Sequence, residues 1–138
     1  MLKVFVYGTL KPGEANYPPY CAGKVIYSTK AYTRGKLYHL PSLGYPAMTE
    51  GEEKVEGFLL TFADSSVLAN LDQLEDYDPQ RHPSENEYYR QKILVYDPAG
   101  KYLAPGWSYF MTTEKVQQLG GIWLPSGCWR RRGDFSRE

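Results

Sequence analysis

One glutamate lies where an amphipathic helix should be apolar, and its position suggests proton-transfer chemistry. The stretch from Asp64 to Tyr77 predicts a helix with Asp64 or Ser65 as its N-cap. Four residues form its apolar stripe, namely Val67, Leu68, Leu71 and Leu74. At about 100° per residue, Glu75 projects inside this stripe, so we expect its carboxylate to point into the protein. Burial raises the pKa of a carboxyl group toward neutrality, which suits a general acid or base.

The periodicity leaves a second interpretation of Glu75 open. If the helix ends at Leu74, Glu75 can turn outward as an ordinary terminal residue, because helix boundaries predicted from sequence are uncertain by roughly two to four residues. The two interpretations differ in whether Glu75 faces the protein interior or bulk solvent.

A glycine turn after the first apolar segment is a second candidate for chemistry. Lys3 to Tyr7 predicts a strand, and Gly8 and Thr9 interrupt it before Lys11-Pro12-Gly13. Such a break can direct several backbone N–H groups toward one point, where they can bind a carboxylate or a phosphate. A strand that ends in a glycine turn without binding any ligand is the common alternative.

Short strands should position these two features. The chain contains 13 tyrosines, and together with Phe, Trp, Val and Ile they populate short segments that Gly and Pro interrupt. The candidate strands are Lys3 to Tyr7, Lys24 to Tyr32, Arg34 to His39, Ala47 to Thr49, Lys54 to Thr61, Tyr88 to Tyr96 and Trp107 to Met111. The stretch between Asp64 and Tyr77 is the one predicted helix. The polar segment from Asp78 to Glu87 predicts a mobile loop without an element, which beside Glu75 could act as a lid.

Length and charge indicate a single domain over residues 1–138, with a core at about 3–111 and a tail at 112–138. The 16 basic and 16 acidic residues cancel, so the chain has no global attraction to nucleic acid or to an anionic membrane. The N-terminal apolar segment is too short for a secretory signal, and no later apolar run approaches a membrane span. We therefore expect a cytoplasmic protein.

The potential metal ligands and thiols are isolated in the sequence. Cys21 and Cys128 form no C-x-x-C motif, and we expect both to be reduced thiols. His39 and His82 have no clustered ligand at metal-binding spacing, so no metal site is expected. The run Arg130-Arg131-Arg132 is interpreted as a solvated end, with an anionic partner as the alternative.

The order of short motifs along the chain resembles the γ-glutamylcyclotransferase-like superfamily. This superfamily includes γ-glutamylcyclotransferases, γ-glutamylamine cyclotransferases and plant avirulence-induced proteins. The matching segments are Val6-Tyr7-Gly8-Thr9-Leu10, Tyr45-Pro46-Ala47-Met48, Val55-Glu56-Gly57, Leu71-Asp72-Gln73-Leu74-Glu75-Asp76-Tyr77, Tyr88-Tyr89-Arg90 and Trp107-Ser108-Tyr109. The tail also resembles the Pro-Ser-Gly-Asp-Trp ending of many bacterial relatives, with Cys128 in the place of the aspartate.

The resemblance implies an α+β, mostly β fold, a compact mixed β-barrel with one main flanking helix. It implies that the backbone amides of the turn Tyr7-Gly8-Thr9-Leu10 bind the substrate's α-carboxylate, and that Glu75 is the general acid and base. The implied reaction closes 5-oxoproline when the α-amino group of a γ-glutamyl unit attacks its own γ-carbonyl. The implied partner is a small-molecule γ-glutamyl substrate, and neither cofactor nor metal is implied.

Two further residues have open roles under this resemblance. Tyr109 matches a family position near the pocket and could hydrogen-bond the substrate or Glu75, while a core tyrosine with a satisfied hydroxyl is the alternative. Arg90 could orient a carboxylate or form an ion pair within the fold, and we favour the ion pair.

Two other functions remain as alternatives. A non-catalytic module could bind a metabolite or a peptide in the same pocket, but retention of the glycine turn together with Glu75 argues against it. Binding of single-stranded nucleic acid would require a basic groove beside exposed aromatic residues, which the neutral net charge disfavours. The acyl acceptor of the reaction and the oligomeric state stay open.

Overall fold

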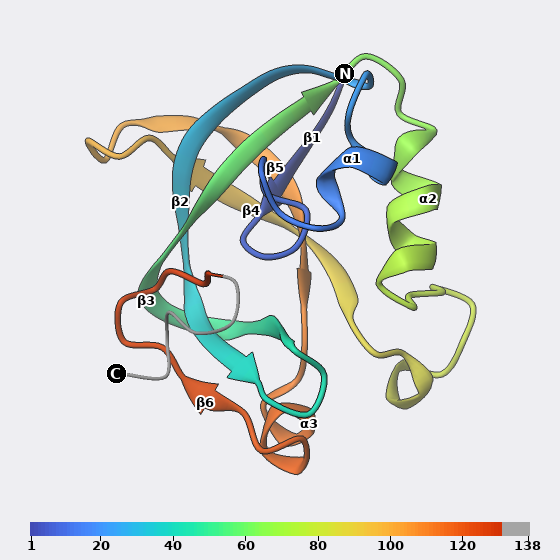
Figure 1. Ribbon diagram of the computed structural model, residues 1–138, viewed down its shortest axis with the longest axis vertical. Coiled ribbons are helices and arrows are strands. Elements are labelled where there is room, and N and C mark those ends of the chain that lie inside the picture. Colours follow the sequence, from blue (N-terminus) through green and yellow to red (C-terminus); the bar gives the residue numbers. More distant parts are fainter. Residues whose placement is uncertain (131–138) are drawn as a thin grey trace.

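Strand pairing closes the sheet of this protein into a ring (Figure 1). The computed structural model describes residues 1–130, and its elements are β1 (Leu2–Val6), α1 (Tyr17–Tyr20), β2 (Val25–Leu40), β3 (Tyr45–Phe62), α2 (Val67–Leu74), the 3₁₀ helix η1 (Pro83–Glu85), β4 (Tyr89–Tyr96), β5 (Tyr102–Phe110), α3 (Thr113–Gln118) and β6 (Ile122–Trp123). The strand order is β3-β1-β5-β4-β2-β6, and β2 also pairs with β3. β1 runs parallel to β5, whereas the other pairings are antiparallel. The prediction of a mostly β fold with mixed strand directions and one main flanking helix is confirmed.

The two longest strands, β2 and β3, form one curved hairpin (Figure 1). The prediction that each consists of two shorter segments is wrong. Thr33, at the predicted break in β2, is buried, and its hydroxyl donates a hydrogen bond of 2.7 Å to a backbone carbonyl near the middle of β4. The register of the hairpin shifts between Gly35 and Lys36, which leaves residues 50–52 of β3 as a bulge. This bulge accommodates polar residues that lie between the two segments predicted for β3.

The structure contains three short elements that the sequence patterns did not predict. α1 is a single turn with prolines at its start. α3 begins after Thr112, whose hydroxyl accepts a hydrogen bond of 3.2 Å from the Lys115 N–H as an N-cap. β6 has two residues and extends the sheet beyond β2. Elements of two to six residues are too short to show a helical or strand period in the sequence.

β1 lies between two apolar cores, because its side chains alternate between its two faces. One core contains Leu2, Val4 and Val6 of β1 together with Val67 and Leu71 of α2. The other contains Phe5 and Tyr7 together with Leu37, Met48, Leu124 and Trp129. As predicted, α2 packs through its apolar stripe, in which Leu68 and Leu74 are half-buried. The turn after β1 therefore starts from a strand that is held on both faces.

The segment from Asp78 to Glu87 is held together by its own hydrogen bonds. It contains η1, so the prediction that it has no element is wrong. Asn86 is buried, and its side-chain amide both accepts a hydrogen bond from the Asp78 N–H (3.0 Å) and donates one to the Asp78 carbonyl (3.2 Å). The Lys115 ammonium donates a further hydrogen bond to the Asn86 carbonyl. A role of this segment as a lid stays a prediction.

The remaining sequence expectations concern thiols, the tail and membrane spans. Cys21 and Cys128 are both free thiols, as predicted. Arg130 is exposed, whereas the rest of the predicted arginine run, Arg131 and Arg132, lies outside the described residues. Within residues 1–130, no helix is long and apolar enough to cross a membrane.

Candidate active site

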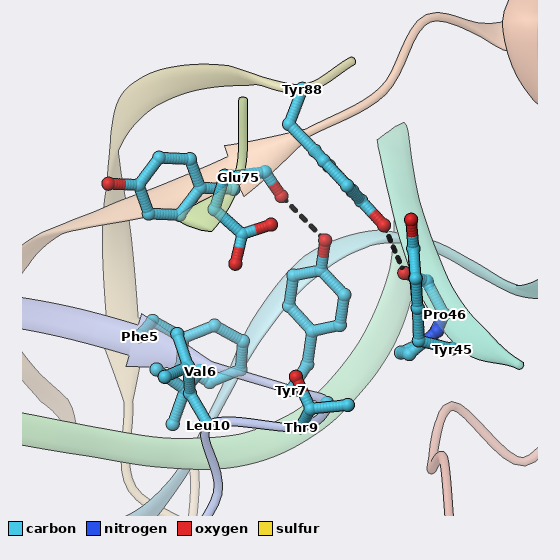
Figure 2. Close-up of a pocket in the computed structure, with 11 residues that line it drawn as sticks. Phe5, Val6, Tyr7, Thr9, Leu10, Tyr45, Pro46, Glu75 and Tyr88 are labelled. Atoms are coloured by element: carbon cyan, nitrogen blue, oxygen red, sulfur yellow. Dashed lines mark hydrogen bonds between the residues drawn. The ribbon is translucent and has the colours of Figure 1, made fainter. Parts of the chain in front are cut away.

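A pocket lies between the turn after β1 and the C-terminal end of α2 (Figure 2). Its lining residues come from β1 and its turn, the start of β3, the end of α2, the residue before β4 and the end of β5: Phe5, Val6, Tyr7, Gly8, Thr9, Leu10, Tyr45, Pro46, Glu75, Tyr88 and Tyr109. All six residues that we predicted for the site, Tyr7, Gly8, Thr9, Leu10, Glu75 and Tyr109, are among them. The fold thus brings together the glycine turn and the glutamate, which are far apart in the sequence.

Glu75 faces the pocket although α2 ends one residue before it. The Glu75 N–H still donates a helical hydrogen bond of 3.0 Å to the Leu71 carbonyl, so the side chain keeps the direction that the helix imposes. Asp76 then adopts a positive φ of 54°, and the Tyr77 N–H donates to the Asp72 carbonyl at 2.9 Å. This is a Schellman C-cap with an aspartate in the usual glycine position. The helix ends at Leu74, as the outward-turning interpretation of Glu75 assumed. The Glu75 side chain nevertheless points into the protein, as the inward-facing interpretation predicted.

The environment of Glu75 favours its protonated form. Burial is the main cause that raises the pKa of Glu75 to about 8, and the negative charges of Glu87 and Asp72 raise it further. Figure 2 shows the Glu75 carboxylate pointing into the cavity beside the Tyr7 ring. Within the described part of the chain, the carboxylate makes no hydrogen bond that would lower its pKa. Glu75 is therefore positioned and tuned to exchange a proton with a bound molecule near neutral pH.

The turn after β1 lines the other side of the pocket. It is closed by a hydrogen bond of 3.0 Å from the Lys11 N–H to the Gly8 carbonyl. Asn16 holds it in place, because its backbone N–H donates to the Thr9 carbonyl (2.8 Å) and its side-chain amide donates to the Thr9 hydroxyl (3.0 Å). Among residues 1–130, no backbone carbonyl accepts a hydrogen bond from the N–H of Thr9 or Leu10. These two N–H groups remain available for an anionic ligand.

Gly8 allows this turn to lie against Pro46, and we expect Gly8→Ala to disturb the site. A Cβ atom on Gly8 would lie 2.6 Å from Cγ of the Pro46 ring, which cannot rotate away. A shift of the turn by about 1 Å can cost on the order of 10²-fold in rate, and the overpacking should cost about 1–3 kcal/mol of stability. Steady-state kinetics and urea unfolding measure the two effects.

The additional substitution Pro46→Ala serves as the control for Gly8→Ala. It removes the ring atoms that the new Cβ would meet, so the double variant should recover stability relative to Gly8→Ala alone. Native stability and native kcat/KM in the Gly8→Ala single variant would show that the close contact does not position the turn.

A buried tyrosine, Tyr7, connects the strands around the pocket. The Tyr7 hydroxyl donates a hydrogen bond of 2.7 Å to the Tyr109 carbonyl and accepts one of 3.3 Å from the Met48 N–H. Burial, followed by the negative charge of Glu75, holds the pKa of Tyr7 well above its usual value, so this hydroxyl stays neutral. Tyr7 therefore links the end of β1 to β3 and β5 beside the pocket. Its hydroxyl keeps its proton at neutral pH.

Tyr109 and Arg90 both bind the carboxylate of Asp72 on α2, three residues before Glu75. The Tyr109 hydroxyl donates a hydrogen bond of 2.6 Å to Asp72 Oδ1. Arg90 donates to both oxygens of the same carboxylate, from Nε to Oδ1 at 2.9 Å and from Nη2 to Oδ2 at 3.1 Å. Tyr109 thus lines the pocket as a buried tyrosine with a satisfied hydroxyl and does not hydrogen-bond Glu75. Arg90 forms the ion pair within the fold that we favoured.

Sequence reasoning missed two tyrosines that line the pocket and a carboxylate that contacts its wall. Tyr88 is buried and donates its hydroxyl to the Pro46 carbonyl at 2.7 Å. Tyr45 lines the same wall, and its hydroxyl donates to the carboxylate of Glu87, a residue that we had placed only at the end of a loop. The signal for Tyr45 and Tyr88 was present, because both belong to the motifs on which the family resemblance rests. No sequence pattern singled out Glu87.

No metal centre is apparent in the part of the chain that the structure describes. There, no group of three or more His, Cys, Asp or Glu side chains is arranged to hold a metal ion.

The residues that build this pocket all fall within a region that matches one protein family. Residues 4–131 match the family described as gamma-glutamyl cyclotransferase, AIG2-like. The chain belongs to this family. A Vibrio cholerae protein that carries gamma-glutamylcyclotransferase as a provisional name is 37% identical over 130 residues, which are 94% of this chain and 96% of the relative. The gamma-L-glutamyl-butirosin B gamma-glutamyl cyclotransferase of Niallia circulans is 31% identical over 109 residues, which are 79% of this chain and 66% of the relative. The resemblance predicted from the motifs is confirmed.

Solved structures show the same AIG2-like fold. An AIG2-like protein from Mus musculus superposes with a TM-score of 0.70 at 22% identity, over 97% of this chain and 91% of that chain. YkqA from Bacillus subtilis superposes with a TM-score of 0.63 at 25% identity, over 93% of this chain but only 39% of YkqA. The cyclotransferase-family fold seen here is therefore shared with proteins of similar and of greater length.

Proposed function

We propose that this protein converts a γ-glutamyl amide into 5-oxoproline and a free amine, with Glu75 as the general acid and base. One observation carries the proposal: the Glu75 carboxylate, whose pKa is raised to about 8, faces the same pocket as the unpaired N–H groups of the glycine turn. A γ-glutamyl amide has a carboxylate at one end and the reacting amide at the other, so it matches both features. The names of the relatives from Vibrio cholerae and Niallia circulans support the same chemistry.

The glycine turn binds the substrate's α-carboxylate in this proposal. The N–H groups of Thr9 and Leu10 donate to it, and Gly8 allows the turn to approach Pro46. With this end fixed, the γ-carbonyl curls back toward the α-amino group beside Glu75. Because both reacting groups belong to one molecule, such orientation supplies much of the acceleration, with effective molarities of roughly 10⁵ M or more.

Glu75 then takes a proton from the attacking nitrogen and gives it to the departing nitrogen. In its ionised form it removes a proton from the α-amino nitrogen while that nitrogen forms a bond to the γ-carbonyl carbon. The tetrahedral intermediate collapses when the bond from this carbon to the amine nitrogen breaks, and protonated Glu75 returns the proton to the departing nitrogen. Glu75 ends in the ionised form in which it began, so the scheme needs no second acid or base and no cofactor.

We expect the activity to rise with pH up to about pH 8. The reaction begins from ionised Glu75, and burial among apolar side chains keeps most molecules protonated at pH 7. After correction for the pKa of the substrate's own ammonium, kcat/KM should increase about tenfold per pH unit well below pH 8 and then level off, because Glu75 must lose its proton. The profile is measured on a substrate whose own ammonium pKa is determined separately. A plateau that already begins near pH 5 would contradict a raised Glu75 pKa.

Product analysis with a panel of γ-glutamyl compounds tests the proposed reaction. The pure protein is incubated with γ-glutamyl amino acids, glutathione, γ-glutamyl-ε-lysine and γ-glutamyl alkylamides, and 5-oxoproline and the amine are quantified by mass spectrometry. Equimolar release of both products from at least one compound is expected. Saturable binding of these compounds without product formation would instead support a non-catalytic binding module.

A further inference from the structure

A second cavity adjoins the catalytic pocket on the side of η1. It has a volume of about 410 Å³, and its lining includes Asn86, Glu87, Tyr88, Tyr89, Glu114 and Lys115. Tyr88 lines both this cavity and the catalytic pocket. The side chain of Tyr88 is therefore a wall that the two cavities have in common.

Glu87 lines the second cavity and contacts Tyr45 in the wall of the catalytic pocket. Its carboxylate accepts the hydroxyl hydrogen bond of Tyr45, and the Tyr45 and Tyr88 rings lie 6.4 Å apart as neighbours in the wall of the catalytic pocket (Figure 2). Among the nearby charges, that of Glu87 contributes most to raising the pKa of Glu75. Glu87 is thus close enough to influence a charge that forms at the reacting atoms.

Four charged or titratable residues line the second cavity, namely Glu87, Glu114, Lys115 and His82. Glu87 is half-buried, and Glu114 is exposed at the rim. The ammonium group of Lys115 is directed to the Asn86 carbonyl by a hydrogen bond, so it is engaged with the segment that forms the wall. The aromatic side of the cavity comes from Tyr88 and Tyr89, which can contact an aliphatic chain.

The proposed reaction dictates where the amine part of the substrate must lie. The γ-glutamyl end occupies the glycine turn, and the departing nitrogen must reach Glu75 to receive its proton. Glu75 points into the pocket and has no hydrogen-bond partner within residues 1–130, which leaves its carboxylate open to that nitrogen. The group attached to the nitrogen can then leave the pocket past Tyr45 and Tyr88, toward Glu87.

We propose that the second cavity holds the amine part of the substrate and that Glu87 selects amines carrying a further positive charge. The inference rests on the proposed function and narrows its substrate class to γ-glutamyl conjugates of diamines and other cationic amines. Conjugates of amino acids are disfavoured, because they would bring a second carboxylate close to Glu87. Glu87 acts on the substrate through charge and takes no part in the proton transfers.

Three γ-glutamyl amides of matched length test this selectivity. Each carries a four-carbon chain on the amide nitrogen, and the chain ends in an ammonium, a methyl or a carboxylate group. We expect kcat/KM for the ammonium compound to exceed that for the methyl compound by about 5- to 10-fold at low salt, with the carboxylate compound slowest. The preference should shrink as the salt concentration rises.

The variant Glu87→Gln separates charge selection from any effect on Glu75. It removes the charge but keeps an oxygen that can accept the Tyr45 hydroxyl. The ratio of kcat/KM for the ammonium compound to that for the methyl compound should fall to about one. The methyl compound reports any change transmitted through Glu75, since it carries no charge for Glu87 to attract. Glu85→Gln, an exposed position in η1, removes the same charge nearby and should leave the ratio unchanged.

The outcomes distinguish failure of the inference from failure of the proposed function. Turnover of all three compounds at similar rates, or a charge preference that Glu87→Gln leaves intact, overturns the role of Glu87 while the cyclotransferase reaction stands. Absence of 5-oxoproline from all three compounds, together with a negative panel of other γ-glutamyl compounds, overturns the proposed function and the inference with it.

Discussion

Glu75→Gln should lower the rate of 5-oxoproline formation by at least about 10², the usual contribution of a general acid or base. Glutamine keeps the shape of the side chain but cannot take a proton from the α-amino group. The carboxylate faces the pocket and makes no hydrogen bond within residues 1–130, so no fold contact depends on it. Because a neutral side chain is already favoured at this half-buried position, the variant should be at least as stable as the native protein near pH 8. Single-turnover kinetics and thermal unfolding measure both effects.

Substrate binding and a matched charge change are the controls for Glu75→Gln. The variant should still bind a γ-glutamyl compound, because the N–H groups of the turn are untouched. Glu52→Gln removes the same charge at an exposed position of β3 and should retain native activity. Glu75→Ala is a poorer test, since it also leaves a void beside the apolar stripe. Near-native turnover by Glu75→Gln would make Glu75 a structural carboxylate.

Asp72→Ala should be the most destabilising single change near the site, at about 2–3 kcal/mol. Asp72 holds both the Arg90 guanidinium and the Tyr109 hydroxyl, and the side chains of the ion pair are only 16% and 17% exposed. Its removal leaves a largely buried cation without its counter-ion, which is far more costly than the loss of an exposed pair. The Trp107 ring, 4.7 Å from the guanidinium, retains part of the stabilisation. Urea unfolding of Asp72→Ala measures the cost.

An exposed ion pair from the same region provides the comparison for Asp72→Ala. Arg81 pairs with Asp76 at 3.0 Å, with side chains 34% and 55% exposed, so Arg81→Ala should cost no more than about 1 kcal/mol. Asp72→Asn keeps an acceptor for the Tyr109 hydroxyl, so its loss of stability should lie between those of Asp72→Ala and Arg81→Ala. Equal stabilities of Asp72→Ala and Arg81→Ala would show that the buried pair contributes no more than a surface one.

Helical projection located the candidate catalytic carboxylate but not the end of its helix. The apolar stripe of α2 predicted that Glu75 faces inward, which is its observed direction. The helix nevertheless ends at Leu74, because Asp76, two residues later, adopts the left-handed conformation of a Schellman cap. An aspartate in that conformation has no specific sequence signature, whereas a glycine there would have marked the boundary.

Contacts between distant segments explain what the sequence could not predict. Thr33 continues β2 because its hydroxyl donates a hydrogen bond to a carbonyl of β4. No local sequence pattern predicts this partner. Glu87 joins the site because Tyr45, 42 positions away, donates to it across the wall of the pocket. Tyr109 was placed at the pocket by resemblance, but its hydroxyl partner, Asp72, emerged only when β5 and α2 were seen together.

Isotope-resolved product analysis tests the central claim most directly. The native protein is incubated with a γ-glutamyl amide in water enriched in ¹⁸O, with Glu75→Gln as the parallel sample. Attack by the substrate's own amine uses no water, so the account predicts unlabelled 5-oxoproline in equal amount to the free amine from the native protein and about 10²-fold less from the variant. Labelled glutamate as the product, or equal 5-oxoproline formation by both proteins, would contradict it.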